Sequence, residues 1–227
     1  VEVQAPDKYD LSDSTYYFGI GASREGKEGV KAVWAQKIEN EEEGFINVEA
    51  LEEASDGGYI IGGRFGFSNI DLGNGETLIN KGGYDGMIIK YDSDGEVEWT
   101  KVIGGNDSDC ITDITETNDG GIIGVGYFSS KNIDLGNDIN IINKGAGRDD
   151  GIIVKYNLDG ELQWAQGIGS NGPDQITAIE GTSDGGYIIG GYLYANINIA
   201  NNVILQKGGV IIKYNEEGEI EWTKGIT

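Results

Sequence analysis

Two identical stretches of sequence carry side chains able to bind a metal ion. Residues 69–74 and residues 132–137 both read NIDLGN, and the side chains with ligand oxygens are Asp71, Asn74, Asp134 and Asn137. Carboxylate and amide oxygens are the ligands that Ca²⁺ prefers, so these loops are candidate calcium sites. Asn, Asp and Gly also form turns by bonding to their own backbone, and a third copy has Asn198 in place of the aspartate. The sequence therefore favours a turn and keeps calcium as the alternative.

A second group of side chains varies in chemistry at equivalent places in related phrases. The phrases SDGGYIIGGRF, NDGGIIGVGYF and SDGGYIIGGYL each place an arginine or a tyrosine just before a long loop, and the loop before the next strand adds further side chains. Loops on a rigid scaffold are common ligand contacts. The candidate ligand-binding residues are Arg64, Tyr84, Tyr127, Arg148 and Tyr192. The sequence favours ordinary packing between blades or an exposed tyrosine for the strand-end residues, and a loop that closes onto the sheet edge for the others, with Asp85 and Asp150 capping a turn.

The composition excludes most catalytic chemistry. The chain has no histidine and a single cysteine, Cys110, which rules out histidine-based triads, histidine-ligated zinc or haem, and a disulfide framework. Carboxylates remain, so glycoside hydrolysis or lyase chemistry is the enzyme class left open. No catalytic residue is assigned. Cys110 lies in an expected strand, and we interpret it as a buried thiol.

The charge excludes further partners. The 227 residues include 39 acidic and 16 basic ones, for a formal charge of −23. Nucleic acids and anionic membranes would be repelled. No run of eighteen apolar residues is present, so no membrane insertion is expected. The chain also lacks an initiator methionine and a signal-peptide core, and we expect it to be a piece of a larger protein.

The elements that hold these residues are repeated along the chain. Tryptophans occur at Trp34, Trp99, Trp164 and Trp222, at spacings of 65, 65 and 58 residues. The last three each lie near the end of a related phrase: KYDSDGEVEWTK, KYNLDGELQWAQ and KYNEEGEIEWTK. The DGG phrase recurs 20 to 22 residues after each of the first three tryptophans. Fixed periods of this length indicate a repeat architecture.

Each repeat is typical of four short strands without a helix. In the middle repeat, the expected strands cover residues 111–117, 122–128, 151–157 and 161–168. The two central strands are almost continuously apolar, as expected when both faces are buried, whereas the last one alternates. A longer polar loop is expected between the second and third strands. Gly95 and Gly160 occupy tight turns that favour a positive φ.

These units predict an all-β fold, a β-propeller or a portion of one. A four-stranded sheet cannot bury both faces alone, so neighbouring units must stack. We expect four-stranded antiparallel blades at residues 39–99, 100–164 and 165–227, a partial blade at residues 15–38, and an N-terminal extension at residues 1–14. The tryptophans and the Ile-Ile runs are expected to form the core between blades.

The phrase GGYDGMIIKYDSDGEVEWTKVIGG from Gly82, followed by a DGG hairpin, resembles the bacterial β-propeller repeat family called SBBP. The resemblance covers residues 34–227. The tryptophan segment is also similar to that of quinoprotein-like propellers, although the turn here is one residue shorter. The SBBP resemblance implies a propeller fold and an exported bacterial protein, extracellular or at the cell surface. It implies no single activity, because a fold does not decide function.

Closure of the ring and function remain as hypotheses. Propellers close with about four to eight blades, so further blades or a second copy must complete the ring, and a fragment of a larger protein is favoured. The leading function is a non-catalytic binding or scaffold module that recognises a protein or a glycan through blade loops, with no required cofactor. The alternatives are a carbohydrate-active enzyme domain with paired carboxylates and a self-assembling structural subunit.

Overall fold

The computed structural model describes residues 45–66, 68–73, 75–145, 147–199 and 203–226 in full. Before residue 45 it describes the backbone of four short strands, β1 (Tyr16–Phe18), β2 (Ala22–Ser23), β3 (Lys31–Ala32) and β4 (Gln36–Ile38). β1 pairs with β4 and β2 with β3, both antiparallel. The expected extension at residues 1–14 and Trp34 lie outside the described residues.

Three four-stranded antiparallel sheets contain most of the other described strands. The first sheet contains β5 (Phe45–Glu53), β6 (Tyr59–Gly66), β9 (Tyr84–Tyr91) and β10 (Val97–Ile103). The second contains β11 (Asp109–Glu116), β12 (Ile122–Phe128), β15 (Asp150–Tyr156) and β16 (Leu162–Ile168). The third contains β17 (Gln175–Gly181), β18 (Tyr187–Leu193), β21 (Gly208–Tyr214) and β22 (Ile220–Ile226). The described part has no helix, so an all-β fold of repeated sheets is confirmed, and nothing in it is long and apolar enough to be a membrane-spanning helix.

The long polar loop of each repeat holds a short hairpin that the sequence analysis did not predict. These hairpins are β7 (Ile70–Gly73) with β8 (Glu76–Leu78), β13 (Asn132–Asp134) with β14 (Asn140–Ile142), and β19 (Ile197–Ile199) with β20 (Val203–Leu205). Ile70, Leu78 and Ile133 are buried, whereas Ile142 and Ile204 are exposed. The hairpins therefore cover the edge of the core while their polar residues face outward.

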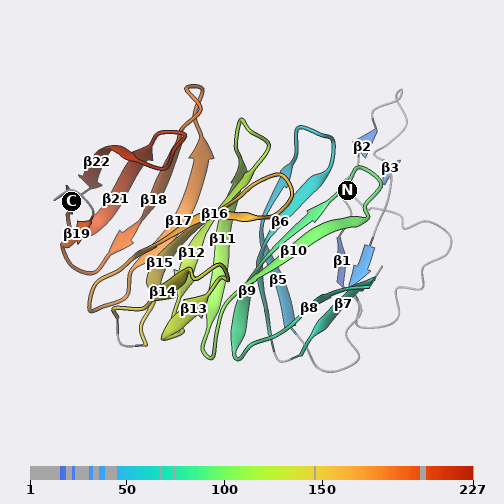
Figure 1. Cartoon of the computed structure of the whole chain (residues 1–227), viewed down its shortest axis with the longest axis horizontal. Helices are drawn as coiled ribbons and strands as arrows, with labels where there is room; N and C mark the ends of the chain where they lie inside the picture. The colour runs from blue at the N-terminus through green and yellow to red at the C-terminus, as the bar shows by residue number, and fades with distance from the viewer. Residues whose placement is uncertain are drawn as a thin grey trace.

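The sheets lie side by side in chain order (Figure 1). The first strand of each sheet contacts the sheet before it: β11 contacts β5 and β6, and β17 contacts β11 and β12. One apolar cluster joins the first sheet to the second and another joins the second to the third. In the second sheet, β15 is buried along its whole length, because a sheet covers it on either side.

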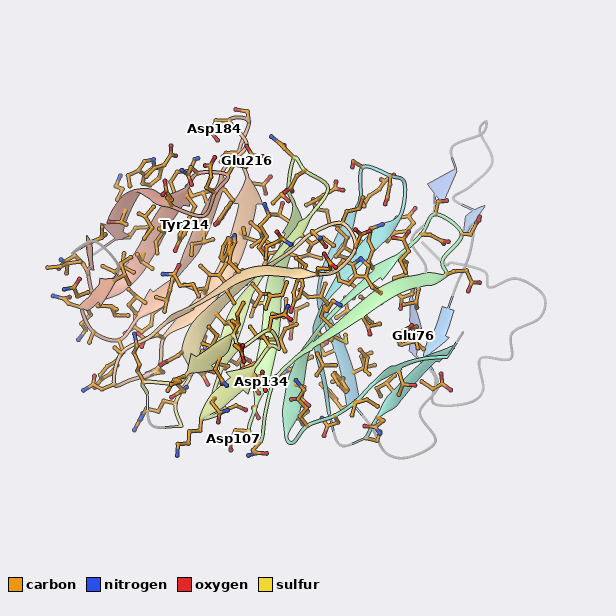
Figure 2. The ribbon with its side chains drawn as sticks, in the orientation of Figure 1. Glu76, Asp107, Asp134, Asp184, Tyr214 and Glu216 are labelled. Carbon is orange, nitrogen blue, oxygen red and sulfur yellow. The ribbon has the colours of Figure 1, made fainter. Side chains whose placement is uncertain are left out.

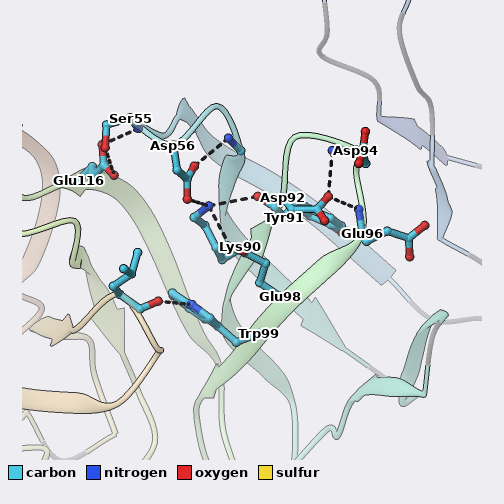
Figure 3. Close-up of polar contacts among 12 residues, drawn as sticks. Ser55, Asp56, Lys90, Tyr91, Asp92, Asp94, Glu96, Glu98, Trp99 and Glu116 are labelled. Atoms are coloured by element: carbon cyan, nitrogen blue, oxygen red, sulfur yellow. Dashed lines mark hydrogen bonds and ion pairs between the residues drawn. The ribbon is translucent and has the colours of Figure 1, made fainter.

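A buried lysine fixes the first hairpin of each repeat. Lys90 Nζ lies 2.7 Å from Asp56 Oδ2 and 3.0 Å from Glu98 Oε2, and it donates to the Tyr91 carbonyl (Figure 3). The equivalent pairs are Lys155 with Asp119 and Lys213 with Asp184. The recurring lysine and the recurring aspartate of the DGG phrase are thus two halves of one structural contact, since a buried ammonium requires a partner.

The repeated tryptophans link one sheet to the next. Trp99 Nε1 donates to the Leu158 carbonyl at 3.0 Å (Figure 3), and the indole packs near the Tyr156 ring, 6.1 Å between centroids. Trp164 stacks on Tyr187 of the third sheet, with 6.1 Å between ring centroids. The pairing register shifts just before each of these tryptophans, and such β-bulges re-aim the side chain that follows.

Gly160 provides a direct test of this contact. Its φ is +74°, and a Cβ built on it would lie 2.8 Å from Trp99 Cδ2. Gly120 has a φ of +75° but would meet only Leu158 Cδ1, at an ordinary 3.6 Å. Both Ala variants should lose about 1 kcal/mol from the positive φ. Gly160→Ala should lose roughly 1–3 kcal/mol more through overpacking, as measured by urea unfolding; equal losses would contradict the packing of Trp99 on this turn.

Trp99 and Trp222 are chemically the same but differ in burial. Trp99 is buried, whereas Trp222 is exposed. Trp99→Ala should lower the free energy of unfolding by about 3–5 kcal/mol. Trp222→Ala should change it by less than about 1 kcal/mol, as is usual for exposed positions. Thermal and urea unfolding of both variants measure the difference, and a large effect at Trp222 would contradict the described packing.

Candidate binding groove and arginine–tyrosine cluster

Three of the five predicted ligand-binding residues lie together where the first two sheets meet. The Arg64 guanidinium carbon is 5.3 Å from the centroid of the Tyr84 ring and 5.8 Å from that of Phe45. Arg64 Nη1 donates to Tyr127 Oη at 3.5 Å. The cluster comes from β5, β6, β9 and β12, and its aromatic faces hold the guanidinium by cation–π attraction.

The cluster is largely occupied by its own contacts. Arg64 Nε lies 3.9 Å from Glu49 Oε1 and makes no hydrogen bond. Burial raises the pKa of Tyr127, and burial likewise raises the pKa of the Cys110 thiol to about 12. Cys110 is therefore buried and protonated at neutral pH, which agrees with its interpretation as a structural thiol.

The other two predicted ligand-binding residues do not join this cluster. Arg148 is exposed in the loop before β15, and Tyr192 is exposed on β18 of the third sheet. Asp149, beside Arg148, accepts hydrogen bonds from Ser129 Oγ at 2.5 Å and from Gln175 Nε2 at 2.6 Å. The second junction thus has a polar contact where the first has an arginine and aromatic rings.

The predicted calcium ligands form turns. Asp71 Oδ1 accepts the Gly73 amide at 2.8 Å, and Asp134 Oδ1 accepts the Gly136 amide at 2.9 Å. Asn137 has a φ of +50° in the turn of the β13–β14 hairpin, and Asn74 lies outside the described residues. Asp134 is at the end of the sheets opposite Asp184 and Glu216 (Figure 2). Among the described residues, no three Cys, Asp or Glu side chains are grouped to hold a metal ion.

An open groove lies along the first junction. It has a volume of about 730 Å³. It is lined by Lys81, Lys101 and Val102 of the first repeat, by residues 134–137 of the β13–β14 hairpin, and by Tyr156 and residues 160–163 of the second repeat. A smaller cavity of about 370 Å³ shares Lys81 and Asp134 with it. Two predicted metal ligands, Asp134 and Asn137, thus line the groove; the sequence analysis did not identify its other residues.

The charged side chains of the groove lining are two lysines, Lys81 and Lys101, and two carboxylates, Asp134 and Glu161. Lys101 Nζ is 5.6 Å from the Trp99 ring centroid and 5.8 Å from that of Tyr156. Burial lowers the pKa of Lys101, while Glu76 and Glu161 act against that shift. Lys81 Nζ donates to the Val102 carbonyl at 3.3 Å. The arrangement offers ammonium groups beside aromatic rings and amide side chains, in a chain whose net charge is −23.

The second junction lacks this arrangement. At the position of Lys101 it has Gln166, and at the position of Gln163 it has Glu221. Gln166 Oε1 accepts a hydrogen bond from the Tyr214 hydroxyl at 3.4 Å, and Glu221 Oε2 is 2.9 Å from the buried Lys213 ammonium. The first junction therefore differs from the second in charge although the two share their packing.

Buried aspartates occur near both junctions, away from the groove lining. Asp109 accepts the Gly105 amide at 2.9 Å and the Ser130 hydroxyl at 2.6 Å. Asp85 and Asp150 accept the amides of Lys81 and Lys144, both at 2.6 Å, so they cap the loop turns as expected. These carboxylates therefore hold main-chain loops in place.

Burial also changes the proton affinity of these carboxyl groups. Burial raises the pKa of both Asp109 and Asp150 from the ordinary 3.8 to about 6, and Asp174 adds to the shift at Asp150. Asp150 Oδ1 has no hydrogen-bond partner. Between pH 3.8 and about pH 6, these carboxyl groups therefore bind protons more strongly in the folded protein than in the unfolded chain. The stability of the fold should fall as the pH rises through this range.

Asp150→Asn tests this dependence, since the amide is neutral at every pH and its oxygen can still accept the Lys144 amide. The variant should gain stability relative to the parent protein as the pH rises from about 4 to about 7. Melting temperatures across this range measure the change. Asp94→Asn, in an exposed turn, removes the same charge, and its melting temperature should change with pH as that of the parent protein does. If the melting temperature of Asp150→Asn also changes in parallel with the parent, the raised pKa of Asp150 is contradicted.

Comparison with known proteins adds little. No family model matches the chain, and no curated protein is similar to it. Among solved structures, a protein of unknown function from Bacteroides caccae is similar to it over 92% of this chain and 93% of that one, with 11% identity and a TM-score of 0.24.

Proposed function

We propose that this chain is a non-catalytic binding module built as a portion of a β-propeller, and that the groove of the first junction is its ligand site. The propeller arrangement is supported by the contacts of β11 with β5 and of β17 with β11, which place the first strands of the three sheets next to one another. Radial stacking of four-stranded sheets brings first strands together in this way. The resemblance to SBBP repeats points in the same direction.

The observation that carries the function is the pair of lysines in the groove. Lys81 and Lys101 line a volume of about 730 Å³ in a strongly acidic chain. Their ammonium groups favour a ligand with carboxylates, while Tyr156 provides an aromatic face and Asn137 and Gln163 provide amide groups. This chemistry suits an acidic glycan or an extended acidic protein segment. The exported bacterial setting, extracellular or at the cell surface, rests on the family resemblance alone.

Non-catalytic binding is favoured over the carbohydrate-active enzyme because of where the carboxylates lie. The two that line the groove are Asp134, which bonds to the Gly136 amide, and Glu161, which is exposed. The carboxyl groups with a raised pKa hold main-chain amides outside the groove lining. A general acid needs a raised pKa at the substrate, and Asp109 and Asp150, whose pKa is raised, lie outside the groove lining.

A glycan array with neutral and uronic-acid oligosaccharides, together with poly-glutamate peptides, tests this function. Binding of carboxylated probes without release of reducing ends is the expected result. Lys101→Gln should weaken that binding about tenfold or more, in line with the loss of one charge-assisted contact. The variant introduces the residue that the second junction already has, so the fold should tolerate it.

Lys224→Gln is the matched control. Lys224 occupies the position of Lys101 in the third sheet and lies outside the groove lining, so its variant loses the same charge without changing the site. Calorimetric titration of both variants with the best carboxylated probe separates local contact from long-range charge. An equal loss in both variants would contradict the groove as the ligand site, and turnover of a bound oligosaccharide would favour the enzyme.

A further inference from the structure

The far face of the third sheet repeats the residues that form the two internal junctions. We call the face of a sheet that packs against the following sheet its outgoing face, and the opposite face its incoming face. The outgoing faces carry Ile60, Ile88, Trp99 and Ile103 in the first sheet, Ile123, Ile153, Trp164 and Ile168 in the second, and Ile188, Ile211, Trp222 and Ile226 in the third. The third outgoing face therefore matches the other two at all four positions.

The outgoing face of the third sheet is more exposed than the outgoing faces of the first and second sheets. At the last of these positions, Ile103 is 1% exposed and Ile168 is 0% exposed, whereas Ile226 is 57% exposed. At the tryptophan position, Trp99 is 8% exposed and Trp222 is 46% exposed. Tyr192 on the same face is 49% exposed. Ile188 and Ile211 are half-buried. Exposed large apolar side chains gathered on one face, here Tyr192, Trp222 and Ile226, are typical of an interaction surface.

The internal junctions show what covers such a face. The Trp99 indole donates to the carbonyl of Leu158 and packs on Gly160, where a Cβ would come within 2.8 Å of the ring. Trp164 packs in the same way on Gly218, where a Cβ would lie 3.0 Å from Cε2. Each covering sheet thus offers a glycine turn for the indole, a tyrosine beside it, and apolar strand residues.

We propose that the outgoing face of the third sheet binds a further four-stranded sheet of this same repeat through the incoming face of that sheet. The match at four positions favours this occupant. Any covering surface must fit the Trp222 indole, the Tyr192 ring and the aliphatic residues of this face at the same time. A further repeat supplies all of these features in the register already seen twice in this chain.

A second copy of this chain fits the face less well. Its first described sheet has an incoming face of its own, but Phe65, Leu78 and Tyr91 on that side are all buried within the chain. Two third sheets facing each other would bring together two outgoing faces, and neither has a glycine turn in position to accept the partner's indole. The occupant is therefore a further repeat, and dimerisation becomes an outcome of the test.

The experiment extends the full chain by one repeat. A second copy of residues 169–226 is placed directly after Ile226, which keeps the connection found between the second and third sheets. Trp222→Ala and Trp164→Ala are made in both the extended and the parent chain. In the parent chain, Trp222→Ala should leave the melting temperature almost unchanged. In the extended chain, it should lower the melting temperature about as much as Trp164→Ala does.

A second extended chain serves as control. In its appended copy, the glycine that corresponds to Gly218 is replaced by leucine. The leucine side chain would occupy the space above the turn in which the Trp222 indole is expected to pack. Labelling with 5-fluorotryptophan, assigned with a Trp222→Phe variant, then reports by ¹⁹F NMR whether the Trp222 indole is open to water. The expected result is protection in the first extended chain and its loss in the control.

Three results would overturn the proposal. The first is a Trp222 indole that stays open to water in the extended chain, including the case in which the added repeat does not fold. The second is an equal effect of Trp222→Ala in the two chain lengths. The third is a concentration-dependent dimer of the parent chain, seen by sedimentation and abolished by Trp222→Ala, which would assign the face to a second copy.

Discussion

The fit of an indole onto the glycine turn of the next sheet is the contact on which the rest of the structure depends. A four-stranded sheet with apolar residues on both faces is not stable alone, because one face would remain in water. The Trp99 contact with Gly160 and Leu158 places the second sheet at a fixed distance and register from the first. That placement closes the apolar cluster between them and creates the groove along their outer strands.

Charge in this chain is divided between structural and surface roles. Lys90, Lys155 and Lys213 are buried and paired with the aspartates of the DGG phrase, so their charges stabilise hairpins and are not offered to a ligand. Lys81 and Lys101 lie at a surface groove instead. Other cations, such as Lys131, Lys144 and Lys207, are exposed outside the lining of this groove.

The sequence predicted the strands well and the candidate site in part. In the middle repeat, the expected strand at residues 122–128 agrees with β12, and that at residues 151–157 differs by one residue from β15, because Gly-rich turns and apolar runs mark strand ends clearly. The hairpins in the polar loops were not predicted, since strands of three residues leave too short a pattern. Of the five candidate ligand-binding residues, Arg64, Tyr84 and Tyr127 lie together at the first junction, whereas Arg148 and Tyr192 lie elsewhere.

The groove could not be predicted, because its residues come from four separate segments that meet only once two sheets are packed. What the repeats do provide is a way to separate structure from specificity. Positions that stay the same in all three repeats, such as the tryptophan and the buried lysine, have structural partners wherever a following sheet is present. Positions that change at a constant place in the fold, such as Lys101 and Gln166, alter the chemistry of a junction without altering its packing. A repeat protein can therefore vary its binding surface one junction at a time while its core contacts stay constant.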